Sequence, residues 1–272
     1  MEKSLVFAGI APHPPLLVPE VGGDRIQAVR RSREGFQEFA RRMVATSPES
    51  VVLISPHSPS DRQYFLARSE PELHGDFGDF GARAVRLSFN NDLELLAAIR
   101  QAASEEKLEL RTLHNDVPLD HGALVPLYYL AAEGWRGPVV VLSFTSQSNG
   151  QHLAFGRSIR LAAERIGRRT ALVASGDLSH RLIVGGPYEF EPTAHCFDEQ
   201  IVDAVAAGDA NGILGIDPNL RYRAGECGYR SMVIALGATE GDIKSPSVLS
   251  YEGPFGVGYM VAVLSEEVWP ER

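Results

Sequence analysis

The sequence VVLISPHSPS at residues 51–60 joins a short apolar run to a histidine that stands between prolines. The four apolar residues at its start predict a buried strand, and the chain then turns at Pro56. His57 follows at once. Because proline fixes the φ angle, Pro56 and Pro59 restrict the backbone on both sides of the imidazole. The segment therefore predicts a strand whose carboxyl end carries a positioned histidine.

Two further segments repeat this arrangement. Residues 4–10 (SLVFAGI) lead to His13 in APHPP, and residues 170–174 (TALVA) lead to His180 in SGDLSH. The carboxyl ends of strands in an open α/β sheet point at the site crevice. One His-Pro loop alone is typical of a solvated turn, but two such loops at two strand ends favour a site. We therefore expect histidines from separate segments to converge.

Helical patterns separate the apolar runs. Helices are predicted at residues 24–45, 92–103, 121–132, 149–166, 193–207 and 227–238, further strands at 64–67, 84–89, 138–144, 248–251 and 259–263, and a loop at 75–81. Strands that alternate with helices favour an α/β sheet flanked by helices on both faces. No repeat or long linker interrupts the pattern, so we expect a single domain over residues 1–272.

Composition narrows the function classes. The chain has 272 residues, a net charge of -9 and two cysteines. The negative charge disfavours nucleic acid as a partner, and two cysteines give no disulfide framework. The N-terminus does not read as a signal peptide, and no apolar stretch approaches the roughly 20 residues that span a bilayer. We expect a cytoplasmic homo-oligomer that does not associate with membranes.

Glu226, in RAGECGYRS, is the candidate for a third metal ligand beside His13 and His57. Two histidines and one carboxylate are typical of an open metal site. The alternative is that Glu226 only favours the positive end of the helix that follows. His121 in LDHGALVPL and His180 are candidates for acid and base catalysis, although either can equally be a hydrogen-bonded structural histidine.

Five motifs, in the order APHPPLLVPEVG, LISPHSP, LDHGALVPL, GDLSH and ECGYRS, together resemble the class III extradiol dioxygenases. This superfamily includes the catalytic B subunit of protocatechuate 4,5-dioxygenase and the Memo-type proteins. The resemblance runs over nearly the whole chain, from His13 to about Gly258. It implies a central mixed sheet between helices.

The resemblance also implies roles for single residues. His13, His57 and Glu226 would bind Fe²⁺, with Zn²⁺ or Mn²⁺ as other possible metals. His180 would take a proton from the substrate, and His121 would act as the acid in ring opening. The implied reaction is extradiol cleavage of a catechol- or aminophenol-type aromatic ring with O₂, next to the two heteroatoms.

Memo-type relatives place a cysteine at about the position of Cys227, so the thiolate is the alternative third ligand. The chain would then be a Memo-like metal-binding protein without ring-cleaving activity, serving an undefined pathway or a protein partner. A zinc hydrolase with the same ligands is a third hypothesis.

Other polar residues carry weaker expectations. Asp120 and Asp177 are candidates to orient His121 and His180. His195, near Cys196 and Asp198 on a predicted helix, is expected to have a structural or supporting role. The loop at residues 75–81 and the segment 184–192 are candidates to cover the site.

Overall fold

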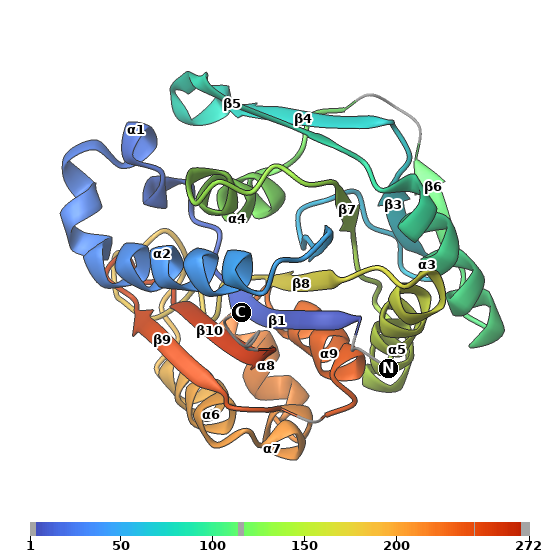
Figure 1. Cartoon of the computed structure of the whole chain (residues 1–272). Coiled ribbons are helices and arrows are strands. Elements are labelled where there is room, and N and C mark those ends of the chain that lie inside the picture. The colour runs from blue at the N-terminus through green and yellow to red at the C-terminus, as the bar shows by residue number, and fades with distance from the viewer. Residues whose placement is uncertain (1–3, 114–116, 242, 268–272) are drawn as a thin grey trace.

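A mixed sheet forms the centre of the protein (Figure 1). The computed structural model describes residues 4–113, 117–241 and 243–267. Within these residues the sheet has eight strands in the order β6-β3-β7-β2-β8-β1-β10-β9. Their bounds are β1 Leu5–Ala11, β2 Ser50–Ile54, β3 Phe65–Arg68, β6 Leu110–Leu113, β7 Val139–Leu142, β8 Thr170–Ser175, β9 Ser247–Glu252 and β10 Tyr259–Glu266. The α/β class and the mixed sheet are confirmed.

The four central strands β7, β2, β8 and β1 run parallel, whereas β10 is antiparallel to β1 and β3 is antiparallel to β7. Successive residues of β2 face opposite sides of this sheet. Val51 and Leu53 enter one apolar core, and Val52 and Ile54 enter the other. Because both faces are buried, the central strands read as continuous apolar runs and show no polar alternation.

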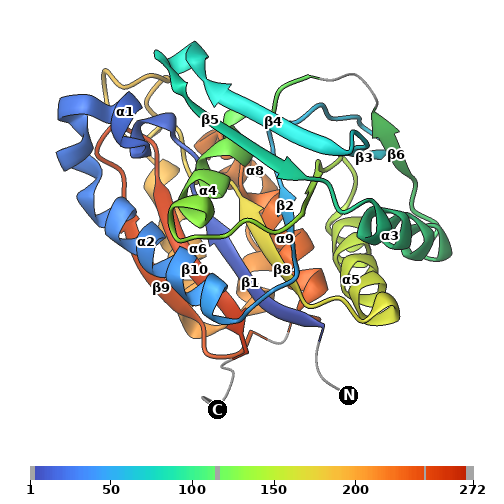
Figure 2. The same ribbon diagram turned by 45° about the horizontal axis from the view of Figure 1, so that its top comes forward.

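Helices cover both faces of the sheet (Figures 1 and 2). The core on one face contains residues of α2 (Arg30–Ala45) and α4 (His121–Ala132). The core on the other face contains residues of α3 Leu93–Glu105, α5 Asn149–Ile166, α6 Ala194–Ala207, α7 Ala210–Leu214, α8 Pro218–Ala224 and α9 Tyr229–Ala238. In the described residues, no helix combines the length and apolar character needed to cross a membrane.

A second, two-stranded sheet overturns the loop expected at residues 75–81. Strand β4 (Glu72–Phe77) pairs antiparallel with β5 (Ala82–Asn90), and only the 3₁₀ turn η3 (Gly78–Phe80) and Gly81 lie between them. A Cβ at Gly75 would lie 2.9 Å from the Leu124 side chain. The glycine that suggested a loop instead lets the hairpin pack closely on α4.

Several element boundaries also differ from the predictions. The predicted helix at residues 24–45 is α-helical only from Arg30, because η2 (Gly23–Val29) is a 3₁₀ segment after α1 (Pro19–Gly22) and η1 (Pro15–Leu17). The helix expected from residue 227 begins at Tyr229, so Glu226 and Cys227 lie in the turn before it. Strand β6 and helices α7 and α8 are too short to give a clear period in the sequence.

Candidate metal centre

His13 and His57 meet at the carboxyl edge of the central strands. His13 follows β1 and His57 follows β2, and the strand between these two is β8. Because all three strands are parallel, the loops that follow them lie at the same edge of the sheet. The Nε2 atoms of the two rings are 3.0 Å apart. The expected convergence of these two histidines is therefore present.

Cys227 completes a group of three donors with these histidines. The ligand atoms of His13, His57 and Cys227 all lie within 4.8 Å of one another. The distance from the Cys227 Sγ to the His13 Nε2 is 3.6 Å. Donors bound to one tetrahedral metal at ordinary bond lengths lie roughly 3.3–3.6 Å apart. The Cys227–His13 distance fits a single metal ion, and the 3.0 Å between the two Nε2 atoms would have to lengthen by roughly 0.3 Å.

The Glu226 carboxylate lies outside this group of donors. Its Oε2 accepts a hydrogen bond of 2.7 Å from the backbone N–H of Tyr229, the first residue of α9. Burial raises the pKa of Glu226, while this hydrogen bond and the positive charges of Arg221 and Arg230 oppose the shift. The arrangement matches the alternative in which Glu226 stabilises the start of a helix.

A close backbone crossing brings Cys227 to the edge of the sheet. The carbonyl oxygen of Asp177 accepts hydrogen bonds from the backbone N–H groups of Cys227 and Gly228, at 3.3 and 3.1 Å. A Cβ on Gly176 would lie only 2.0 Å from the Cα of Gly228. Position 176 therefore has no room for a side chain where the loop after β8 meets the turn before α9, and position 228 has little.

Ser175 fixes the orientation and the tautomer of His13. The Ser175 hydroxyl donates a 2.6 Å hydrogen bond to the carbonyl oxygen of Gly122. It therefore accepts the 2.9 Å hydrogen bond from Nδ1 of His13. With its proton on Nδ1, the ring presents the lone pair of Nε2 to Cys227 and His57. A hydrogen bond of this kind on the second nitrogen is typical of metal-binding histidines.

Asp120 holds the loop that carries His57. Its two carboxylate oxygens accept hydrogen bonds from Ser55 and Ser58, at 2.5 and 2.6 Å. One of them also accepts from the backbone N–H of Ala123 and caps α4. The sequence suggested Asp120 as a partner of His121. Its side-chain hydrogen bonds join it instead to Ser55 and Ser58, on both sides of His57.

Asp177 likewise serves a different residue from the one expected. Its Oδ1 accepts a 2.9 Å hydrogen bond from the backbone N–H of His13, and its own N–H donates to the Cys227 Sγ at 3.2 Å. Ser175 was not predicted as a site residue. Its only sequence signal is its place in the SGDLSH motif, at the end of a buried strand.

His121 and His180 flank the three donors. The ring of His121 stacks on His57, with centroids 4.2 Å apart. Burial lowers the pKa of His121 to about 4, and the nearby His57 adds to the shift. Burial also lowers the pKa of His180 to about 4, with a further contribution from His57. Both imidazoles are therefore neutral near pH 7.

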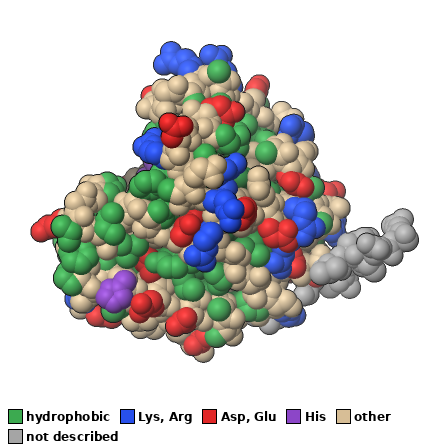
Figure 3. Space-filling model, turned by 90° about the vertical axis from the view of Figure 1, so that its left-hand side faces the viewer, with side chains coloured by type: hydrophobic (Ala, Val, Ile, Leu, Met, Phe, Trp, Pro, Cys, Tyr) green, Lys and Arg blue, Asp and Glu red, His purple; other side chains and the backbone are tan. Residues whose placement is uncertain are grey.

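Each of these two histidines contacts an exposed aromatic side chain. Phe80 makes an edge contact with His121, with ring centroids 5.5 Å apart, and Tyr188 makes one with His180, with ring centroids 5.1 Å apart. Phe80 is 40% exposed and Tyr188 is 53% exposed. Figure 3 shows hydrophobic side chains gathered on one part of the left-hand face, next to a hollow. The two rings are thus available to a ligand that approaches the metal centre.

The charge balance around the three donors also favours a cation. Burial raises the pKa of the Cys227 thiol, and the negative charges of Asp177 and Glu226 raise it further. Burial raises the pKa of Asp177 to about 7. Burial lowers the pKa of His13 well below its usual value, so this ring is a neutral donor. A bound metal ion would offset the negative charge and stabilise the thiolate.

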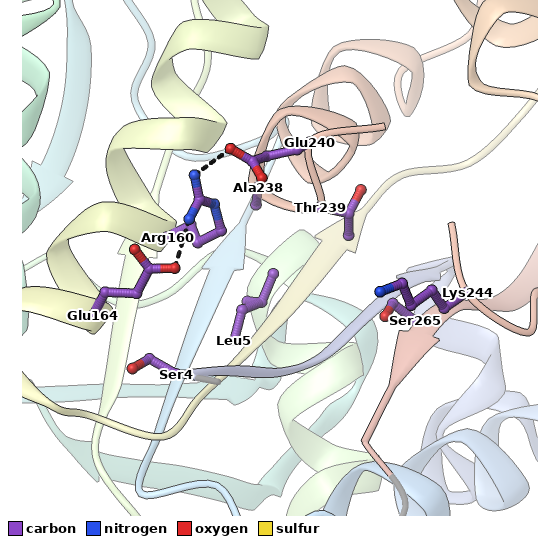
Figure 4. Close-up of a pocket in the computed structure, with 9 residues that line it drawn as sticks. All are labelled: Ser4, Leu5, Arg160, Glu164, Ala238, Thr239, Glu240, Lys244 and Ser265. Atoms are coloured by element: carbon purple, nitrogen blue, oxygen red, sulfur yellow. Dashed lines mark hydrogen bonds and ion pairs between the residues drawn. The ribbon is translucent and has the colours of Figure 1, made fainter. Parts of the chain in front are cut away.

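A separate cavity of about 270 Å³ lies at the opposite edge of the sheet (Figure 4). Ser4 and Leu5, at the start of β1, form part of its wall. Arg160 makes ion pairs there with Glu164 and Glu240. The remaining lining residues are Ala238, Thr239, Lys244 and Ser265. None of the described residues that line it is a histidine or a cysteine, so this cavity is distinct from the metal centre in both place and chemistry.

Comparisons with known proteins show the family and the fold of the chain. Residues 8–262 match the family model described as the catalytic LigB subunit of aromatic ring-opening dioxygenase. Protein CA_C1420 of Clostridium acetobutylicum is 33% identical over 263 residues, which cover 94% of this chain. The match covers 56% of that protein, so the chain spans about half the length of this relative.

A solved structure has a similar fold. The uncharacterized protein JW3007 from Escherichia coli K12 superposes with a TM-score of 0.62 and 16% sequence identity. The match covers 95% of this chain and 98% of that one. At this level of identity the likeness concerns the fold alone.

Proposed function

The chain belongs to the family of the catalytic LigB subunit of aromatic ring-opening dioxygenases, and we propose that it binds one transition-metal ion with His13, His57 and Cys227. In this proposal it is a Memo-like metal-binding protein. The observation that carries the proposal is the 3.6 Å distance from the Cys227 Sγ to the His13 Nε2. The neighbouring Glu226 carboxylate is engaged at the start of α9.

The identity of the third donor decides which chemistry the centre supports. Two histidines and a carboxylate are typical of ferrous oxygenases, whereas a thiolate is a softer donor that favours zinc or copper. A metal held by two imidazoles and a thiolate would supply Lewis acidity to a small ligand in an open position. We therefore place metal binding, and not ring cleavage, as the primary function.

Ring cleavage with ferrous iron is the second candidate, and the surroundings of the three donors favour it. His180 and His121 are neutral and flank the centre, so His180 can accept a proton from a substrate hydroxyl, whereas His121 must first gain a proton before it can act as an acid. Phe80 and Tyr188 offer apolar surface to an aromatic ring. This candidate requires Glu226 to leave Tyr229 and bind the metal.

The two candidates are separated by metal binding in matched variants. All variants carry Cys196→Ser, because the chain has only two cysteines and a thiolate–cobalt absorption band then reports Cys227 alone. Cys227→Ser and Glu226→Gln are compared after anaerobic purification and titration with Co²⁺. We expect Cys227→Ser to abolish the band and to weaken metal binding at least about tenfold, whereas Glu226→Gln keeps both.

A second measurement tests activity directly. The parent protein, loaded with Fe²⁺, is incubated with a panel of catechols and aminophenols while O₂ uptake is recorded. We expect no ring-opened product. Turnover that Glu226→Gln abolishes, together with iron binding that survives Cys227→Ser, would replace our primary proposal by the extradiol dioxygenase.

A further inference from the structure

A second group of potential metal ligands lies on α6, outside the centre described above. The ligand atoms of His195, Cys196 and Glu199 all lie within 4.8 Å of one another. The distance between the Cys196 Sγ and the His195 Nε2 is 3.5 Å. We propose that these three residues form an accessory binding site for a single Zn²⁺-like ion.

The first turn of α6 explains why the three side chains meet. His195 and Glu199 are four residues apart, so they lie on the same side of the helix, one turn from each other. Cys196 is adjacent in the sequence, and its Sγ turns toward the imidazole. A sulfur and a nitrogen bound to one tetrahedral metal at ordinary bond lengths lie roughly 3.6 Å apart. The donors are thus already spaced as a bound ion requires.

The three side chains of this group are accessible to solvent. His195 and Glu199 are exposed and Cys196 is half-buried, so an ion from solvent can reach all three. The sequence suggested a structural or supporting role for His195. In the structure its imidazole lies at the surface, and its hydrogen-bond partner is the thiol beside it.

The donor types select the class of ion. A thiolate, an imidazole and a carboxylate together suit zinc and its borderline neighbours, whereas magnesium and calcium prefer oxygen ligands. Three protein donors leave a fourth position for water or a ligand from solution. An accessory site of this kind does not depend on which reaction or partner the main centre serves.

The surroundings of the group carry both signs of charge. Asp198 lies on the same turn, with its carboxylate directed inward to the N–H of Ser179 and the hydroxyl of Tyr251. Hydrogen bonds from Thr193 lower the pKa of Glu191, with smaller contributions from Arg223 and Arg181, and Arg223 on α8 also donates to the Thr193 hydroxyl. The Arg223 guanidinium is therefore engaged with its own partners.

The test uses the full chain with Cys227→Ser, so that any thiolate–cobalt absorption band must come from Cys196. We expect Co²⁺ to produce the band with saturation at one equivalent and micromolar affinity, and Zn²⁺ to displace it. His195→Ala and Glu199→Gln should each weaken binding at least about tenfold, equal to roughly 1.4 kcal/mol. Asp203→Asn is the matched control, because Asp203 is exposed on the same helix one turn beyond Glu199.

Three results would overturn the site. One is the absence of the band. Another is a band whose affinity does not change in Glu199→Gln, which would indicate metal bound by the cysteine alone. The third is an equal loss in Asp203→Asn, which would indicate only the general negative charge of the helix. A failure of metal binding at His13, His57 and Cys227 is recognised separately, because the thiolate–cobalt band of Cys227 is recorded in variants that carry Cys196→Ser.

Discussion

At the residue scale, the main centre depends on hydrogen bonds that hold donor atoms rather than on the donors alone. The Nε2 of His13 presents its lone pair toward a metal because Ser175 accepts a hydrogen bond from the Nδ1–H and donates its own hydrogen bond to the carbonyl oxygen of Gly122. The ring is buried, with 1% exposure, so water cannot replace this serine. Ser175 therefore affects metal binding through His13, without contacting the metal itself.

Ser175→Ala is expected to weaken metal binding about 10–100-fold while the fold remains intact, because the His13 ring loses the acceptor that fixes its tautomer. The measurement is a competition titration against a chelating dye. Ser143→Ala is the matched control, since Ser143 is also buried beyond the end of a central strand and its hydroxyl has no hydrogen-bond partner within the described structure. Equal losses in both variants would contradict the role of Ser175.

At the scale of elements, the start of α4 and the loop after β2 form one unit through Asp120. The same carboxylate caps the helix and binds Ser55 and Ser58 on either side of His57. A local helix cap thus determines where a metal ligand lies. His121, the first residue of α4, is positioned by the same contact and stacks on His57.

Asp120→Ala is expected to lower the free energy of unfolding by about 2–4 kcal/mol, because the helix loses its cap and two buried hydroxyls lose an acceptor. It should also weaken metal binding, because the His57 loop is released. Asp209→Ala removes the cap of α7, where Asp209 accepts from Gly212. This control should lose about 1 kcal/mol and keep its metal affinity. Urea denaturation and cobalt titration give the two quantities.

An Asp120→Ala protein that loses stability but binds cobalt as tightly as the parent would show that the loop is positioned without Asp120. In that case the prolines on both sides of His57 would be sufficient to hold it.

At the scale of the whole molecule, the centre exists only where two distant parts of the chain cross. Gly176 directly follows β8, and Gly228 directly precedes α9, about fifty positions later. Their backbones approach so closely that a single methyl group at Gly176 has no space. This crossing places the Cys227 sulfur beside the His13 ring.

Gly176→Ala is expected to lower the free energy of unfolding by about 1–3 kcal/mol or more and to remove the thiolate–cobalt band of Cys227, because the crossing must open. Gly150→Ala is the control. A Cβ at Gly150 in α5 meets only the Ser148 Oγ at 3.7 Å, so stability should be unchanged or rise by up to about 1 kcal/mol. A Gly176→Ala protein with parental stability and an intact band would refute the tight crossing.

The α/β class and the positions of His13 and His57 after strands can be predicted from the amino-acid sequence alone. Both follow from local patterns, since a strand buried on both faces needs a continuous apolar run such as residues 51–54. The sequence did not reveal the β4–β5 hairpin, because Gly75 and Asp76 carry loop-like composition into a strand that packs on α4.

The folded chain was needed to distinguish Glu226 from Cys227 as the neighbour of the two histidines. The two residues are adjacent, and both suit a metal, so sequence left both ligands open. The start of α9 at Tyr229 gives the Glu226 carboxylate a backbone N–H to accept from. The Gly176–Gly228 crossing brings the Cys227 sulfur to His13. Side-chain direction in a turn depends on what the turn packs against, and a linear sequence does not contain that contact.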